Sequence, residues 1–181
     1  GLGSYPGGDS QFLGMLGMHG SYEANNAMHD CDLMINIGAR FDDRITGKID
    51  EFSPKSKKVH IDIDPSSINK NVKVDLPIVG DVADIINSTL KTIKKTKPNF
   101  MKSNKQKISK WWEKIAKWRS VNSLNFENST ETIKPQYAVQ RLYELTKDKD
   151  TYITTEVGQH QMWAAQHYKF NKPNRWMTSG G

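Results

Sequence analysis

Short apolar runs alternate with amphipathic helical patterns along the first half of this chain. Residues 21–30 contain good helix formers behind Ser21, a residue type that caps helices, and the apolar run LMINIG that follows predicts a buried strand. The segment VHIDID alternates apolar and polar residues up to Pro65, LPIVG is a third short strand, and residues 81–95 repeat apolar residues at helical spacing behind Asp81. Strands that alternate with helices are typical of parallel sheets, so we expect a doubly wound α/β fold with a mainly parallel sheet.

A second α/β unit begins nearer the C-terminal end. After Pro135, the sequence QYAVQRLYELTK predicts an amphipathic helix, TYITTEVG a strand with its turn, and QHQMWAAQHY a helix that starts directly after Gly158. A change in composition between the two units marks a domain boundary. We expect a central domain over residues 1–90, truncated at its N-terminus, a lysine-rich helical linker over 91–131, and the start of a second, truncated domain over 132–181.

The formal net charge of +6 is concentrated in one segment. Residues 91–117 contain ten lysines and one acidic residue, Glu113. Within this segment, ISKWWEKIAKW repeats isoleucine and tryptophan at helical spacing, with lysines on the other face. Such a helix could bind a membrane surface or an acidic partner, but we favour an amphipathic connector that packs its tryptophans on a neighbouring domain. Arginine, which binds phosphate in bidentate fashion, does not occur there before Arg119, so we expect neither nucleic acid nor a membrane as a partner.

The sequence carries no sign of secretion. No window approaches the roughly 18 to 20 apolar residues that a membrane helix needs, the start lacks the layout of a signal peptide, and the single Cys31 cannot form an internal disulfide. We therefore expect a cytoplasmic protein. Gly1 is not an initiator methionine, and both ends lie in glycine-rich turns, so we also expect an internal fragment of a longer chain.

The loops after the first two strands contain residues that suit a dinucleotide. In open parallel sheets, ligands lie beyond the carboxyl ends of the strands. Arg40 and Arg44 can neutralise a diphosphate, Gly38 allows close approach of the backbone, and Asp62 or Asp64 can bind ribose hydroxyls. An ion pair of Arg40 with one of the neighbouring aspartates, and strand-end acids that act as caps, are equally good structural explanations.

Two helix starts offer backbone donors to an anion. The segment GDV, residues 80–82, opens one helix, and Gly158 followed by Gln159 and His160 opens another. An ordinary strand, turn and helix with polar caps explains the second equally well. The stretch GMLGMHG places three glycines at an interval of three, which predicts that a neighbour approaches this backbone closely. The histidines lack zinc-ligand spacing, and no G-x-S-x-G nucleophile motif is present.

Several longer segments, taken together and in order, resemble a known enzyme family. GLGSYPG, LGMLGMHGSYEANNAMHDCDLMINIGARFDDRITGK, VHIDIDPSSINKN, GDV, VGQHQMWAAQ and RWMTSGG are similar to the catalytic subunits of the acetolactate synthases (acetohydroxyacid synthases), which depend on thiamine diphosphate. The resemblance implies a central domain that binds FAD and a C-terminal domain that holds thiamine diphosphate with Mg²⁺. The FAD residues that it implies are Gly3, Leu16, Gly17, Met18, His19, Gly38, Arg40, Asp42, Arg44, Ile45, Asp62, Ile63, Asp81 and Val82. The thiamine diphosphate residues that it implies are Val157, Gly158, Gln159, His160, Met162 and Gly180.

The same resemblance implies a reaction. Two pyruvates condense to 2-acetolactate with loss of CO₂, or pyruvate and 2-ketobutyrate give 2-aceto-2-hydroxybutyrate, in branched-chain amino-acid biosynthesis. The flavin undergoes no net redox change. The family's activating glutamate lies upstream and its magnesium ligands lie downstream, so no catalytic or metal-binding residue is expected here, and this chain alone is expected to be inactive. A homo-oligomer, dimer or tetramer, and a small regulatory subunit are further implied partners.

Three other interpretations remain open at this point. The first is a related thiamine enzyme, such as a pyruvate oxidase or a glyoxylate carboligase, although GMLGMHG and GQHQMWAAQ favour the synthase. The second is a non-catalytic nucleotide-binding module on the same sheet. The third is a nucleic-acid or membrane binder that uses the lysine-rich segment, which would show salt-sensitive binding.

Overall fold

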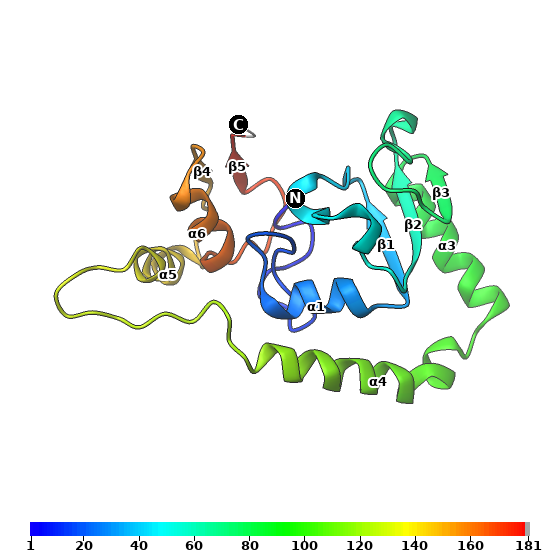
Figure 1. The fold of residues 1–181 in the computed structure, drawn as a ribbon, viewed down its shortest axis with the longest axis horizontal. Helices are drawn as coiled ribbons and strands as arrows, with labels where there is room; N and C mark the ends of the chain where they lie inside the picture. The colour runs from blue at the N-terminus through cyan, green and yellow to red at the C-terminus, as the bar shows by residue number, and fades with distance from the viewer. Residues whose placement is uncertain (180–181) are drawn as a thin grey trace. The chain divides into compact units, whose positions relative to one another are not determined.

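The computed structural model describes residues 1–179, and the chain forms two compact units (Figure 1). One unit comprises Gly1–Ala24 together with Asn122–Gly181, and the other comprises Asn25–Val121. Each unit contains a parallel sheet with helices. The expected α/β fold is thereby confirmed. No helix among the described residues is long and apolar enough to cross a membrane.

A three-stranded parallel sheet organises the unit Asn25–Val121. Its strands are β1 (Leu33–Ile37), β2 (Lys57–Asp62) and β3 (Leu76–Val79), in the order β1-β2-β3. All three strands occur where the apolar runs predict them. Helix α1 (Tyr22–Asp30) precedes β1, and its expected cap is present, because the Ser21 hydroxyl accepts a hydrogen bond from the N–H of Ala24 at 3.2 Å.

Short helical turns connect these strands. α2 (Asp43–Thr46) and the 3₁₀ turn η1 (Ile49–Glu51) lie between β1 and β2, and η2 (Pro65–Ser67) follows β2. Beneath the loops, Phe41, Phe52 and Val72 form a small buried core. Partly buried apolar side chains that pack on this core are Met28, Met34, Ile45 and Val74.

Strand β1 is less buried than its apolar sequence predicts. Met34 faces the core, whereas Leu33, Ile35 and Ile37, on the other face, are 51%, 54% and 46% exposed. The expectation of a buried strand is therefore wrong for this face, because nothing within the described residues covers it. Parallel sheets ordinarily bury both faces, and four of the five residues of this strand are apolar.

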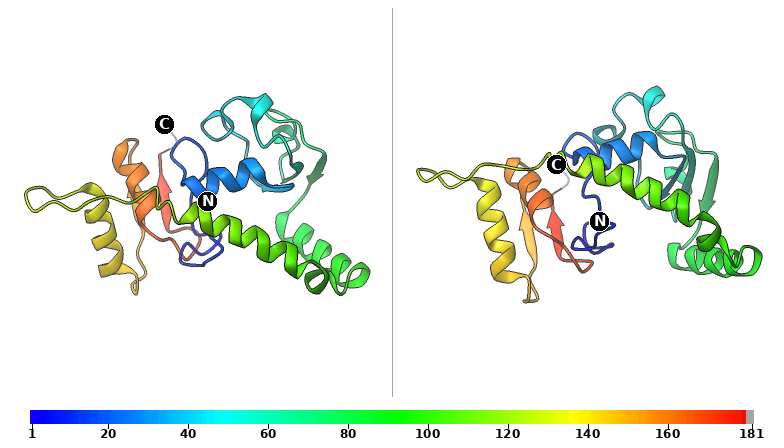
Figure 2. Two further views of the ribbon diagram at one scale, coloured as in Figure 1. Left: turned by 60° about the horizontal axis from the view of Figure 1, so that its bottom comes forward. Right: turned by 90° about the horizontal axis from the view of Figure 1, so that it is seen from below.

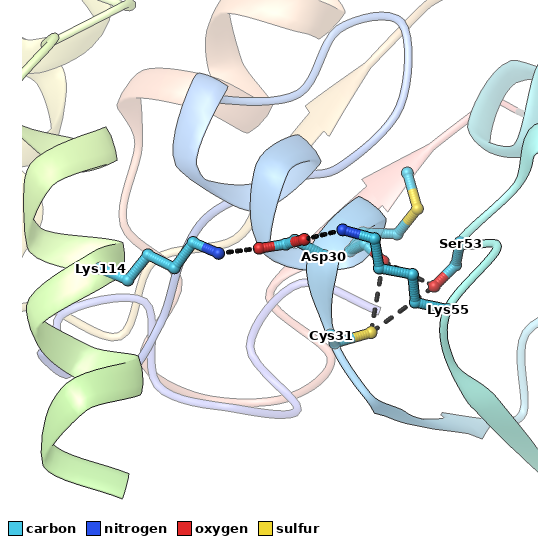
Figure 3. Close-up of polar contacts among 6 residues, drawn as sticks. Asp30, Cys31, Ser53, Lys55 and Lys114 are labelled. Atoms are coloured by element: carbon cyan, nitrogen blue, oxygen red, sulfur yellow. Dashed lines mark hydrogen bonds and ion pairs between the residues drawn. The ribbon is translucent and has the colours of Figure 1, made fainter. Parts of the chain in front are cut away.

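Two helices follow the sheet. α3 (Val82–Thr96) starts behind the expected cap Asp81, and α4 (Phe100–Arg119) contains the tryptophan repeat. Figures 1 and 2 show α4 running beside α1. In α4, Ile115 is buried and Trp111 contacts Trp118 edge to face at 5.8 Å. Lys114 forms an ion pair with Asp30 of α1, which Figure 3 shows together with Lys55 on the other side of the carboxylate.

The helical part of the expected linker is shorter than predicted. It ends at Arg119, and residues 121–134 contain turns and bends but no helix. Asn122, the first residue of the polar sequence NSLNFENST, adopts a left-handed φ of +51°, and this sequence lacks the repeated apolar residues of an amphipathic helix.

The second unit contains the C-terminal elements. α5 (Pro135–Thr146), β4 (Ile153–Thr155) and α6 (Gln159–His167) lie where the sequence predicts them, and β5 (Trp176–Thr178) pairs in parallel with β4. Strand β5 was not predicted, because WMT is too short to show a period. The aromatic side chains that pack in this unit are Tyr143, Tyr168, Phe170 and Trp176.

Candidate functional site

The carboxyl ends of the strands in Asn25–Val121 lie side by side. Beyond β1, the N–H of Gly38 donates to the Ile61 carbonyl at 2.8 Å, and beyond β3 the N–H of Gly80 donates to the Asp62 carbonyl at 3.0 Å. The ladder thus extends into the loops. The loops that follow these strands therefore start from one edge of the sheet, where ligands of open parallel sheets bind.

Gly38 has the properties expected of a glycine beside a ligand. Its φ of +62° is left-handed, and a Cβ placed on it would meet no atom within 4 Å. The backbone is therefore open on this side, which fits a cofactor that lies directly against it.

The two arginines of the following loop are exposed and weakly paired. Arg40 contacts the Asp42 carboxylate at 3.1 Å and Arg44 contacts that of Asp43 at 3.7 Å, with arginine side chains 69% and 71% exposed. The ion-pair alternative is thus realised, with Asp42 as the partner of Arg40. Exposed pairs of this kind contribute little stability, so either guanidinium can turn to a phosphate at small cost.

Between these residues the loop passes through a strained position. Phe41 has a φ of +54° and a side chain only 6% exposed. A left-handed conformation of a non-glycine residue costs on the order of 1–3 kcal/mol and persists where its surroundings hold it. Ile45, further along, packs on the same core.

The two acids considered for a ribose differ in burial and in hydrogen-bond partners. Asp64 accepts hydrogen bonds from the N–H and the hydroxyl of Ser66, and these bonds lower the pKa of its carboxyl. Asp64 is therefore committed to capping η2. Asp62 is 9% exposed and its carboxylate accepts from the N–H of Asp64 at 2.9 Å, while the neighbouring Ile63 is 72% exposed.

His60 was not singled out by sequence reasoning. It is fully buried, and within the described residues neither ring nitrogen has a hydrogen-bond partner. Its ring lies edge to face with Phe41 at 5.2 Å, and its Nε2 is 3.6 Å from the Asp62 carboxylate. The only sequence signal for His60 was its place beside two acids in VHIDID.

The start of α3 has the expected geometry. One oxygen of Asp81 accepts from the N–H groups of Ala83 and Asp84, at 2.8 and 3.2 Å, so Asp81 is the N-cap. Val82 is 38% exposed. A ligand at this position could donate a hydrogen bond to the second oxygen of Asp81 or interact with the positive end of the helix.

The glycine-rich segment near the N-terminus belongs to the other unit. A Cβ on Gly20 would lie 2.6 Å from the Leu16 Cα, because the chain turns back on itself here and the N–H of Gly20 donates to the Gly17 carbonyl at 2.9 Å. Gly17 has a φ of +96°. The close neighbour of Gly20 is thus the backbone of the same segment. Met18 is 66% exposed.

Close approach of the backbone also explains the glycine at position 3. With a φ of +89°, it would place a Cβ 2.0 Å from the Lys172 carbonyl oxygen. The N-terminal segment continues along the same stretch, where the N–H of Gly7 donates to the Phe170 carbonyl at 2.8 Å.

The residues expected to bind FAD therefore fall into two groups. The structure brings one group together at the sheet edge of Asn25–Val121: Gly38, Arg40, Asp42, Arg44, Ile45, Asp62, Ile63, Asp81 and Val82. The remaining ones belong to the other unit: Gly3, Leu16, Gly17, Met18 and His19.

The turn before α6 presents backbone donors. Gly158 is the N-cap with a φ of +153°, and its missing Cβ would lie 3.1 Å from the His160 ring. The N–H groups of Gln159 and His160 are in the first turn, where a helix supplies no acceptor. This arrangement fits a phosphate group. Val157 is 55% exposed.

Further contacts fix this turn in place. The Gln161 side chain donates to the Thr178 hydroxyl at 2.6 Å and to the Ser179 carbonyl at 3.0 Å, which ties α6 to β5. Met162 is half-buried, and Gly180 lies outside the described residues. Within residues 1–179, no cluster of three or more His, Cys, Asp and Glu side chains is placed to hold a metal ion.

Comparison with known proteins matches two stretches of the chain to one family. Residues 1–89 match the central domain of thiamine pyrophosphate enzymes, and residues 156–181 match their C-terminal TPP binding domain. The whole chain is 47% identical to the acetolactate synthase large subunit of Haemophilus influenzae and 45% identical to the isozyme 3 large subunit of Escherichia coli, and it spans 31% of the length of each. It is 44% identical to chloroplastic acetolactate synthase 1 of Nicotiana tabacum, of which it spans 26%.

Proposed function

Since the chain belongs to the acetolactate synthase large subunits of the thiamine pyrophosphate enzyme family, we propose that the protein containing it condenses two 2-ketoacids with loss of CO₂. Two pyruvates give 2-acetolactate, and pyruvate with 2-ketobutyrate gives 2-aceto-2-hydroxybutyrate, in branched-chain amino-acid biosynthesis. The observation that carries this proposal is the identity of 45–47% to such subunits over all 181 residues, without a gap in coverage.

Thiamine diphosphate supplies the electron sink that makes decarboxylation of a 2-ketoacid possible. The contribution of this chain is to hold that cofactor's phosphates. Gly158 leaves the backbone uncovered, and the N–H groups of Gln159 and His160 would donate to phosphate oxygens at the positive end of α6. Val157 and Met162 line the same turn, and Gly180 is proposed at the pyrimidine side.

FAD is the second proposed cofactor, and it takes no part in net redox chemistry. Arg40 and Arg44, whose aspartate partners are exposed, would bind the diphosphate, Gly38 would admit the cofactor against the backbone, and Asp62 would accept from ribose hydroxyls. Residues proposed to complete the adenosine end and the flavin contact are Asp42, Ile45, Ile63, Asp81, Val82, Gly3, Leu16, Gly17, Met18 and His19.

The assembly and location belong to the same proposal. We infer a cytoplasmic homo-oligomer, a dimer or a tetramer, that takes 2-ketoacids as substrates, requires Mg²⁺ and accepts a small regulatory subunit. The domain limits proposed from the sequence are residues 1–90, 91–131 and 132–181. The activating glutamate and the magnesium ligands are proposed to lie outside residues 1–181.

An assay of the complete protein tests the reaction. The purified protein is given pyruvate with thiamine diphosphate, Mg²⁺ and FAD, and acetolactate is measured with each cofactor omitted in turn. Acetolactate formation that requires thiamine diphosphate and Mg²⁺ is the expected result. Oxygen consumption with pyruvate would indicate an oxidase, turnover of glyoxylate a carboligase, and absence of thiamine diphosphate binding a nucleotide-binding module.

A further inference from the structure

The loop that carries Arg40 and Arg44 is held from a distant part of the sequence. The Asn71 side-chain amide donates to the carbonyl of Arg40 at 3.0 Å and to that of Phe41 at 3.1 Å, across 31 and 30 residues. These carbonyls belong to the two peptide groups on either side of the Phe41 Cα. Phe41 is the strained residue of the loop, with a φ of +54°. The amide therefore fixes the two peptide groups that a relaxation of Phe41 would rotate.

The residue after Asn71 holds the same position from the inside. Val72 is 5% exposed and packs with Phe41 and Phe52 in the buried core. The Phe41 ring also meets Phe52 edge to face at 5.7 Å and His60 at 5.2 Å. Adjacent residues, Asn71 and Val72, thus hold the backbone and the side chain of Phe41, respectively.

The direction of the two arginines depends on this anchoring. Arg40 directly precedes Phe41, and α2, which carries Arg44, begins two residues after Phe41. A non-glycine residue keeps a left-handed φ only where its surroundings compensate for the strain. Without the amide, Phe41 can return to a common conformation, and both guanidinium groups then point elsewhere.

We propose that Asn71 is a positioning residue that fixes the Arg40–Arg44 loop for the diphosphate of a bound dinucleotide. The binding of a diphosphate by this loop rests on the proposed function, whereas the anchoring of the loop by Asn71 does not. Asn71 itself has no required contact with the cofactor; it acts through the carbonyls of Arg40 and Phe41. Its role requires a hydrogen-bond donor, because both partners are acceptors.

The donor requirement gives a sharp test with a matched control. Asn71→Asp removes the donor at nearly constant shape and places a carboxylate against two carbonyl oxygens. Asn69→Asp makes the same change two residues away, where the Asn69 side chain accepts from the N–H of Val74 at 2.9 Å, so a carboxylate can serve as well. Asn71→Ala removes the donor without adding charge and is the second variant if Asn71→Asp does not fold.

Two readouts are taken on the complete protein. Hydrogen exchange is measured for the α2 amides of Ile45, Thr46 and Gly47, which donate to the Asp42 and Asp43 carbonyls. We expect several-fold faster exchange there in Asn71→Asp and Asn71→Ala, unchanged exchange in β2, and wild-type behaviour of Asn69→Asp. FAD affinity, from flavin fluorescence, should fall about five- to tenfold in the Asn71 variants alone.

The outcomes separate the inference from the proposed function. Wild-type exchange at α2 in both Asn71 variants would overturn the inference, even if the protein binds FAD. Faster exchange with unchanged FAD affinity would limit Asn71 to a structural role and overturn its positioning role. If the wild-type protein binds no FAD at all, the proposed flavin site fails, whatever the exchange shows.

Discussion

Lys114 of α4 forms an ion pair with Asp30, the last residue of α1, although 84 positions separate the two in the sequence. Lys55 binds the other oxygen of the Asp30 carboxylate at 2.7 Å, so that one acid bridges two lysines (Figure 3). The Asp30 side chain is only 19% exposed. The lysine-rich helix is thus tied to α1 by one lysine, while its other lysines remain at the surface.

Removal of the Asp30 charge should loosen α4. Asp30→Asn leaves two ammonium groups facing an amide, so we expect a lower unfolding temperature and faster tryptic cleavage within α4. The control is Glu51→Gln, which breaks the ion pair of Glu51 with Lys48. Both of these side chains are 69% exposed, so this variant should change the unfolding temperature and the cleavage rate little. Equal behaviour of the two variants in thermal unfolding and limited proteolysis would contradict this role of Asp30.

The same site predicts a dependence on acid. Hydrogen bonds from Lys114 and Lys55 lower the pKa of Asp30 from 3.8 to about 2. A carboxyl whose pKa is lower in the folded state stabilises the fold above its usual pKa and loses that contribution as the pH falls to the folded value. The difference in unfolding temperature between wild type and Asp30→Asn should therefore be constant above about pH 5 and shrink between about pH 4 and about pH 2. A constant difference down to pH 2 would argue against the lowered pKa.

Local signals in the sequence were sufficient for most helices and strands. Helix starts were predictable because a capping residue acts on the backbone only three or four positions away. The starts of α1, α3 and α6 follow Ser21, Asp81 and Gly158, as the sequence predicts. The alternation in VHIDID and the apolar run LPIVG similarly gave β2 and β3. Of the candidate site, the convergence of the loops at the carboxyl edge was predictable, since parallel strands end at the same edge.

Features that depend on distant contacts were not predictable from local patterns. Asn71 looked like any polar loop residue, because its role requires the carbonyls of Arg40 and Phe41, some thirty residues earlier. An apolar run such as LMINIG indicates which side chains prefer burial. It does not indicate whether the described residues contain elements that cover both faces of the strand. The glycine interval in GMLGMHG was visible, whereas the identity of its neighbour required the turn itself, in which Gly20 meets Leu16.

The glycines in this turn lead to a stability prediction. Gly20→Ala would place a Cβ 2.6 Å from backbone atoms of Met15 and Leu16, which cannot move as a side chain can, so we expect a loss of about 1–3 kcal/mol. Gly47→Ala is the comparison, because its φ is +55° but its Cβ would meet no atom within 4 Å. Its ψ of −126° completes a backbone conformation that only glycine adopts readily, so alanine should cost about 1–3 kcal/mol through strain alone. Denaturant unfolding of both variants measures each loss, and wild-type stability of Gly20→Ala would contradict the clash.

The turn before α6 should be sensitive to a single methyl group. Gly158→Ala brings a Cβ to 3.1 Å from the His160 ring and forces a side chain into a φ of +153°, so the first-turn N–H groups are displaced. In the complete protein we expect thiamine diphosphate to bind about tenfold more weakly or worse, with FAD affinity unchanged. Gly47→Ala should leave thiamine diphosphate affinity at the wild-type value. Equal affinity of wild type and Gly158→Ala, by calorimetric titration, would remove this turn from the cofactor site.

Arginine and lysine should differ at position 40 if this residue binds a diphosphate. Arg40→Lys keeps the positive charge and can keep the exposed pair with Asp42, so stability should change little. A lysine is a point charge, however, and loses the bidentate geometry with which a guanidinium binds phosphate oxygens. We therefore expect FAD affinity to fall about three- to tenfold, while Arg141→Lys, on an exposed face of α5 beside Glu144, leaves it unchanged. Flavin fluorescence titration of the complete protein measures both variants. An affinity that is the same for arginine and lysine at position 40 would mean that this residue contributes only charge, and that the diphosphate is bound elsewhere along the loop.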